Sequence, residues 1–74
     1  MNIIKQENFK SARGWDIKKT LVEHNGKHYL ISEAPSECLI FPSDSEGNCD
    51  YVEVGSALHT SDAIIQIQNG QILS

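Results

Sequence analysis

A chain of 74 residues with 39 % hydrophobic and 22 % charged residues is long enough for one thin hydrophobic core and too apolar to stay disordered. Its net charge of -4 at pH 7 disfavours nucleic-acid binding, which requires clustered Lys and Arg. No apolar run reaches the roughly 18 residues that span a bilayer, and residues 1–5 lack a signal-peptide pattern, so we expect a cytoplasmic protein without membrane contact.

The chain shows no internal repeat, low-complexity tract or linker, so we expect a single domain over residues 1–74. Residues 1–14 have weak periodicity and are predicted to form an irregular lead-in, with one helical turn around residues 6–10. An antiparallel β-meander of three to four strands over residues 15–54 and a helix over residues 60–69 follow. The predicted class is α+β, with the short C-terminal helix packed on one face of the meander.

The clearest local signal is Asn25-Gly26, which lies between two β-rich runs. Asn-Gly is the preferred type I′ hairpin turn, because both central residues need a positive φ. This predicts strands over residues 15–23 and 27–32. The two-residue loop also fixes the register, which pairs His24 with Lys27, Glu23 with His28, Val22 with Tyr29, Leu21 with Leu30, and Thr20 with Ile31.

This register sorts the hairpin side chains onto two faces. One face carries Trp15, Ile17, Leu21, Leu30 and Ala34, interrupted by Lys19 opposite Ser32. The other carries Thr20, Val22, Tyr29 and Ile31 among Asp16, Lys18 and His24. We predict that the first face is the core face under the helix and that the second is an apolar stripe facing solvent.

Exposed apolar patches that contain an aromatic side chain often mark partner sites. The candidate partner-binding residues are therefore Thr20, Val22, Tyr29 and Ile31. Cover of this stripe by the lead-in or by a second subunit remains an equal alternative.

The second half of the meander is predicted from short apolar and alternating runs. Residues 37–41 suit a third strand closed by Pro42, and residues 43–50 suit a polar loop. Residues 51–54 alternate and predict a fourth strand that Gly55 stops.

The C-terminal stretch fits two structures. Residues 60–62 supply helix-capping side chains ahead of an apolar run, and Gly70 is placed as the left-handed stop of a helix. Alternation over residues 63–67, and Asn-Gly ahead of residues 71–73, also suit a second hairpin. We favour the helix, because the capping residues have a role only there and because one face of the meander needs a cover.

Zinc is suggested by five side chains of the right chemistry, His24, His28, Cys38, Cys49 and His59. The hairpin register points His24 and His28 to opposite faces, and the cysteines lack C-x-x-C spacing, so we expect no zinc site and two reduced cysteines. Cys38 lies inside an apolar strand, where a small core residue is a better interpretation than a reactive thiolate.

Calcium is suggested by oxygen-bearing side chains at alternate positions from Asp44 to Asp50. Against an EF-hand loop, Gly47 falls at position four, and Gly55 occupies position twelve, where a bidentate Glu is required. No cofactor is expected. Since no catalytic motif is present either, we expect a protein that is not an enzyme.

The run from Glu37 to Val54 combines an apolar strand, an acidic Gly turn and a Tyr-centred strand, and a Thr60-Ser61-Asp62-Ala63 helix start follows it. This half of the chain resembles a pattern in small, uncharacterised phage and prophage proteins. The resemblance implies a strand-turn-strand-helix ending and a mobile-element context, and it supplies no catalytic residues.

The leading hypothesis is a phage or prophage accessory protein that binds another protein through its sheet surface, for instance to inhibit a host enzyme or defence system. The alternative is a self-associating structural protein without catalytic activity, such as a homodimer that buries the Tyr29 stripe or pairs an edge strand.

Overall fold

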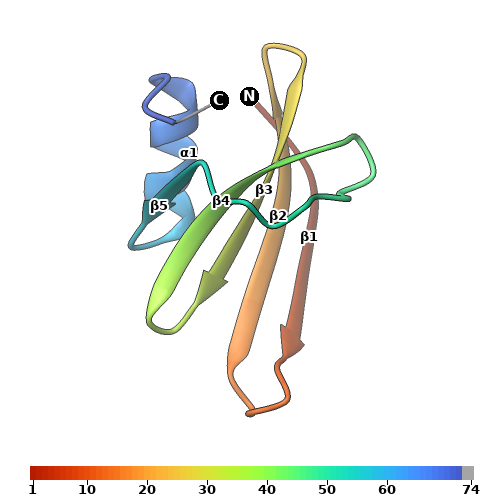
Figure 1. The fold of residues 1–74 in the computed structure, drawn as a ribbon, viewed down its shortest axis with the longest axis vertical. Helices are drawn as coiled ribbons and strands as arrows, with labels where there is room; N and C mark the ends of the chain where they lie inside the picture. Colours follow the sequence, from red (N-terminus) through yellow and green to blue (C-terminus); the bar gives the residue numbers. More distant parts are fainter. Residues whose placement is uncertain (73–74) are drawn as a thin grey trace.

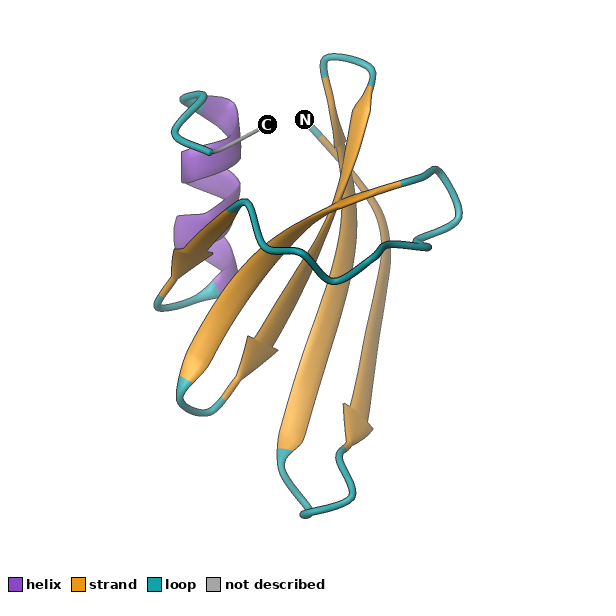
Figure 2. Ribbon diagram, in the orientation of Figure 1, coloured by secondary structure: helices purple, strands orange, loops and turns teal. Residues whose placement is uncertain are grey.

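The computed structural model describes residues 1–72, which form one antiparallel sheet and one helix (Figures 1 and 2). The elements are β1 (Asn2–Lys10), β2 (Asp16–His24), β3 (Lys27–Ala34), β4 (Glu37–Ser43), β5 (Gly55–Ala57) and α1 (Thr60–Gln68). The five strands follow one another in the order β1-β2-β3-β4-β5, and each pairs antiparallel with its neighbour. The predicted α+β meander with a short C-terminal helix on one face is confirmed.

The hairpin of β2 and β3 forms as the sequence predicts. Asn25 and Gly26 have φ values of 53° and 79°, the positive values that a type I′ turn requires. All five predicted cross-strand pairs are present, including Val22 with Tyr29 and Leu21 with Leu30.

The prediction of an irregular lead-in with one helical turn over residues 6–10 is wrong, because Asn2–Lys10 form the nine-residue strand β1. Every residue of β1 is exposed, so the strand has no buried face. Its sequence therefore lacks the alternation of apolar and polar residues by which strands are recognised. The strand is held by its backbone pairing with β2 and by cross-strand side-chain bonds. Lys10 Nζ lies 2.9 Å from Asp16 Oδ1, and the Gln6 amide donates to Thr20 Oγ1 at 3.3 Å.

The predicted strand over residues 51–54 is also wrong. β4 continues two residues beyond its predicted end, and the last strand, β5, begins only at Gly55. Tyr51 has a φ of 56°, a left-handed conformation that interrupts an extended chain. The segment between Ser43 and Gly55 is instead a loop that crosses the front of the sheet in Figure 1.

The predicted C-terminal helix is confirmed as α1, in place of the second hairpin; residue 73 of that hairpin lies outside the described residues. Gly70, with a φ of 69°, ends the helix as predicted. Its N–H donates to Ile67 O at 3.2 Å, and the N–H of Gln71 donates to Gln66 O at 2.9 Å, which together make a Schellman motif.

The start of α1 is held by a residue from the sheet. The N-cap position is His59, and the first helical residue, Thr60, donates both its backbone N–H (2.6 Å) and its hydroxyl (2.7 Å) to Glu33 Oε1 of β3. These two hydrogen bonds hold the pKa of the Glu33 carboxyl below its ordinary value. Glu33 therefore performs the capping that residues 60–62 were expected to provide.

The main core lies between α1 and the sheet. It consists of Val22, Tyr29, Ile31, Cys38, Ile40, Ala63 and Ile67, with Val54, Ala57, Ile64 and Ile72 packed against it. A second, smaller cluster of Leu21, Leu30 and Phe41 lies on the other face, with Leu39 and Cys49 beside it. Within residues 1–72, no helix is long and apolar enough to cross a membrane.

Candidate functional site

The predicted partner-binding stripe does not face solvent, and that assignment of the two faces is wrong. Thr20, Val22 and Ile31 are 0 % exposed and Tyr29 is 5 % exposed. The apolar members belong to the main core under α1. The helix covers the face that was expected to be open, and Trp15, which was placed on the core face, is 47 % exposed.

The face opposite α1, here called the open face, is covered in part by the loop between β4 and β5. Asp44 organises the start of this loop, since its Oδ1 accepts the backbone N–H groups of Glu46 and Asn48, each at 2.9 Å. These hydrogen bonds hold the pKa of Asp44 below its ordinary value. Asp44, the first carboxylate of this oxygen-rich loop, therefore stabilises the turn of the loop itself.

Farther along, the loop places an aromatic ring on the sheet. The Tyr51 ring meets the Phe41 ring edge to face, with centroids 5.2 Å apart and an interplanar angle of 71°. Tyr51 therefore contacts one member of the small Leu21, Leu30 and Phe41 cluster. Tyr51 nevertheless stays 58 % exposed.

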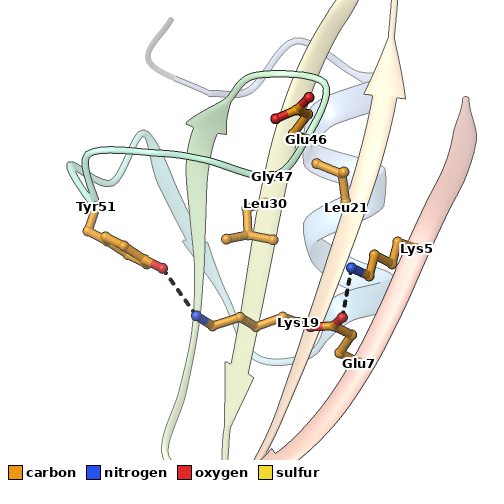
Figure 3. Close-up of a pocket in the computed structure, with 8 residues that line it drawn as sticks. All are labelled: Lys5, Glu7, Lys19, Leu21, Leu30, Glu46, Gly47 and Tyr51. Carbon is orange, nitrogen blue, oxygen red and sulfur yellow. Dashed lines mark hydrogen bonds and ion pairs between the residues drawn. The ribbon is translucent and has the colours of Figure 1, made fainter.

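Lys19 lies between two aromatic rings on the open face. Its Nζ is 5.3 Å from the centroid of Phe9 on β1 and 5.2 Å from the centroid of Tyr51, and it donates to Tyr51 Oη at 3.2 Å. Figure 3 shows the lysine stem reaching across the sheet toward the tyrosine hydroxyl. Cation–π contacts of this kind contribute about 0.5–1 kcal/mol at exposed sites. Phe9, Lys19 and Tyr51 are called the aromatic–lysine patch below.

Two charged residues of β1 lie next to the patch. Lys5 Nζ and Glu7 Oε1 form an exposed ion pair at 2.8 Å, and Glu7 is directly opposite Lys19 in the sheet. The hydrogen bond and the opposite charge raise the pKa of Lys5 and lower that of Glu7. Positive and negative charges therefore alternate along this part of the open face.

A shallow cavity of about 160 Å³ lies among Lys5, Glu7, Lys19 and Tyr51 (Figure 3). Its lining is formed by Lys5, Glu7, Lys19, Leu21, Leu30, Glu46, Gly47 and Tyr51. Sites that enclose a drug-sized ligand occupy about 300–1,000 Å³. This cavity is smaller and has mixed charge, so its size suits one side chain of a partner better than a free ligand or cofactor.

The backbone at Tyr51 is strained, because its φ of 56° is in the left-handed region that non-glycine residues rarely adopt. Such a residue costs on the order of 1 kcal/mol and persists only where its surroundings hold it. Here the strained conformation presents an exposed aromatic ring above the cavity. Strain of this kind is concentrated at functional sites, which makes Tyr51 the most informative residue of the open face.

Within residues 1–72, no helix covers the edge of the sheet beside the patch. β1 is the terminal strand, and α1 contacts only β2, β3, β4 and β5 among the described elements. Large apolar side chains are exposed along β1, with Ile3 at 55 %, Ile4 at 48 % and Phe9 at 41 %. A long, uncovered edge strand offers unpaired backbone groups to another chain.

The residues considered for zinc are spread over the structure. Cys38 is buried and Cys49 is half-buried, both as free thiols. His28 Nε2 lies 3.8 Å from Glu23 Oε2, its cross-strand neighbour near the turn of the β2–β3 hairpin. Across residues 1–72, no group of three or more His, Cys, Asp or Glu side chains is placed to hold a metal ion.

The interpretation of Cys38 as a small core residue is confirmed by its complete burial. Burial, followed by the nearby Glu33 charge, raises the pKa of its thiol, the opposite of what a nucleophile needs.

Searches against protein-family models, curated proteins and solved structures found no match to this chain.

Sequence reasoning missed the aromatic–lysine patch. In the sequence, Lys19 stands out only as a charged residue that interrupts the apolar face of the hairpin. The other two members could not be found this way, because Phe9 lay in the supposed lead-in and Tyr51 in a supposed strand.

Proposed function

We propose that this protein is a protein-binding module whose contact surface is the aromatic–lysine patch of the open face. The observation that carries the proposal is Tyr51, a strained aromatic residue that is 58 % exposed and lines a small cavity. Tyrosine is among the residues that contribute most to protein interfaces, because it offers a large, rigid contact area with a polar end.

The surroundings of Tyr51 support recognition of a protein. Phe9 adds a second exposed ring, and Val52, which follows Tyr51, is 69 % exposed. Lys19, Lys5 and Glu7 provide charged groups at the border of these apolar side chains. A central aromatic anchor with a polar border is the usual composition of an interface.

We propose further that the partner is a bacterial host enzyme or a component of a host defence system, bound and inhibited by a phage or prophage accessory protein. The support for this part is the resemblance of residues 37–64 to small phage proteins, and the open face provides the surface for such binding. The proposal assigns the protein binding and no catalysis.

Affinity capture from a bacterial lysate tests the proposal. The tagged wild type is compared with Tyr51→Asn, since asparagine tolerates a positive φ and removes the ring without straining the loop. Leu58→Asn is the matched control. Leu58 is 79 % exposed and lies in the short chain segment that joins β5 to α1. We expect a protein that wild type and the control retain and that Tyr51→Asn loses.

The proposal fails if Tyr51→Asn, shown by circular dichroism to be folded, captures the same proteins in the same amounts as wild type. It also fails if wild type captures nothing beyond what an unrelated tagged domain captures.

A second candidate function is self-association as a structural protein without catalytic activity. The exposed strand β1 favours it, because an edge strand whose residues are all exposed can pair with its equivalent in another copy.

A further inference from the structure

The charges of β1 are complementary to themselves in the antiparallel register centred on Gln6. If two copies of β1 run antiparallel with Gln6 facing Gln6, then Lys5 of each copy lies opposite Glu7 of the other. Residues directly opposite on antiparallel strands have side chains about 4.5–5.5 Å apart on the same face of the sheet. Two Lys5–Glu7 ion pairs would therefore form between the copies, one on each side of the twofold axis.

The neighbouring registers lack this complementarity. A shift of one residue in either direction leaves Lys5 and Glu7 opposite uncharged residues. A shift of two residues in one direction puts Lys5 opposite Lys5, and in the other direction Glu7 opposite Glu7. Like charges directly opposite one another are destabilising, so among these registers the charges favour the one centred on Gln6.

The existing ion pair within β1 strengthens this arrangement. Lys5 and Glu7 are 2.8 Å apart in one chain and face the same side of the sheet. In the paired strands, the four charges would alternate around a square, with each lysine beside one glutamate of its own chain and opposite one of the second copy. Like charges would occupy the diagonals, where their repulsion is weakest.

Residues 1–72 leave room for this pairing. All nine residues of β1 are exposed, and α1 lies toward the β5 side of the sheet, away from β1 (Figure 1). The one irregularity, between Ile3 and Lys5, precedes the charged segment, and the strand is regular from Lys5 to Lys10. Ile3, Ile4 and Phe9 are also exposed along this strand.

We propose that two copies of this chain associate through β1 in the register that places Lys5 opposite Glu7, which joins their five-stranded sheets into one continuous sheet. The twofold axis runs perpendicular to the sheet, so both aromatic–lysine patches face the same side. The dimer would present two partner sites on one surface.

Sedimentation velocity of the purified protein, from about 10 µM to about 1 mM, tests the proposal with charge reversals. We expect a concentration-dependent dimer for wild type. Lys5→Glu makes both opposed pairs acidic and Glu7→Lys makes both basic, so each variant alone should dimerise roughly tenfold more weakly. Lys27→Glu and Glu37→Lys carry the same charge changes outside β1 and should dimerise as wild type does.

Two combinations identify the register. An equimolar mixture of Lys5→Glu and Glu7→Lys should form a heterodimer, because all four opposed charges are then complementary again. The double variant Lys5→Glu/Glu7→Lys should regain the wild-type dimer. Circular dichroism of each variant checks that the fold is retained.

The proposal is overturned if wild type remains monomeric up to about 1 mM, in which case the charges of β1 only protect an edge. It is also overturned if the mixture associates no better than its components. These results leave the proposed partner binding untouched, because the capture experiment changes Tyr51 and keeps the charges of β1.

Discussion

Replacement of Glu33 by glutamine should weaken the link between the start of α1 and the sheet. In the wild type, one carboxylate oxygen accepts two hydrogen bonds from Thr60, at 2.6 and 2.7 Å, and thereby joins β3 to the first residue of the helix. Glutamine keeps the size and one oxygen acceptor but loses the negative charge. The change therefore tests the charge of the cap with little disturbance of packing.

The expected loss follows from the two roles of that carboxylate. Helix N-caps contribute about 0.5–2 kcal/mol, and a negative charge at a helix N-terminus adds about 0.3–1 kcal/mol at partly exposed sites. Since glutamine retains part of the hydrogen bonding, Glu33→Gln should lower the free energy of unfolding by about 1 kcal/mol, and Glu33→Ala by about 2 kcal/mol. For a domain of this size, about 1 kcal/mol lowers Tm by roughly 4–8 °C.

The effect should depend on pH in a defined direction. The pKa of Glu33 is lower in the folded protein than its ordinary value of 4.5, so the ionised form is the one that stabilises the fold. This stabilisation is fully present above about pH 4.5 and is lost as the pH falls through the folded pKa. Glu33→Gln should differ from wild type at pH 7 and approach it in strong acid.

Urea unfolding followed by circular dichroism at a series of pH values measures this difference. Glu37→Gln, an exposed change of the same kind at the start of β4, is the control and should leave the free energy of unfolding nearly unchanged. The reasoning is refuted if Glu33→Gln is as stable as the control at pH 7, or if its deficit is the same in strong acid as at pH 7.

Three further changes test the core, the thiols and the loop. Tyr29→Asp places a charge at a site that is 5 % exposed and should cost at least about 3 kcal/mol, so a cooperative thermal transition near that of wild type would contradict the burial of this face. In the native protein a thiol reagent should modify Cys49 readily and Cys38 only on unfolding, because burial raises the pKa of Cys38; equal rates would contradict this. Asp44→Ala removes the acceptor of two loop N–H groups and should speed their hydrogen exchange, whereas unchanged protection would show that the loop is held in another way.

Local signals in the sequence predicted the hairpin and the helix correctly. Asn25-Gly26 predicts a turn in which both residues have a positive φ. Because this turn has two residues, it also determines the register in which β2 and β3 pair. Gly70 marked the end of α1 in the same way. The turn and the end of α1 depend on residues adjacent in the chain, so the sequence alone is sufficient for them, whereas the start of α1 depends on the distant Glu33.

The choice of core face could not be made from the same information. Tyr29, Leu30 and Ile31 are consecutive and all buried, because β3 is a central strand with apolar cover on both faces. Alternation carries no information in such a run. The side that receives α1 depends on the path of the loop and on Glu33, whose contact with Thr60 spans 27 residues.

The candidate site was missed for a related reason. β1 is exposed along its whole length, so it lacks the periodic pattern that burial produces. Tyr51 has a positive φ, and its ring contacts Phe41 and Lys19, which are distant in the chain. Strands without a buried face and residues in unusual conformations are recognisable only once the tertiary structure is known.

The most direct test of the proposed function is the affinity between the purified protein and its captured partner, measured by titration calorimetry. Loss of a central interface tyrosine typically costs about 2 kcal/mol or more, so Tyr51→Asn should raise Kd at least about thirtyfold while Leu58→Asn leaves it unchanged. Equal Kd values for wild type and folded Tyr51→Asn would contradict the assignment of partner binding to the open face.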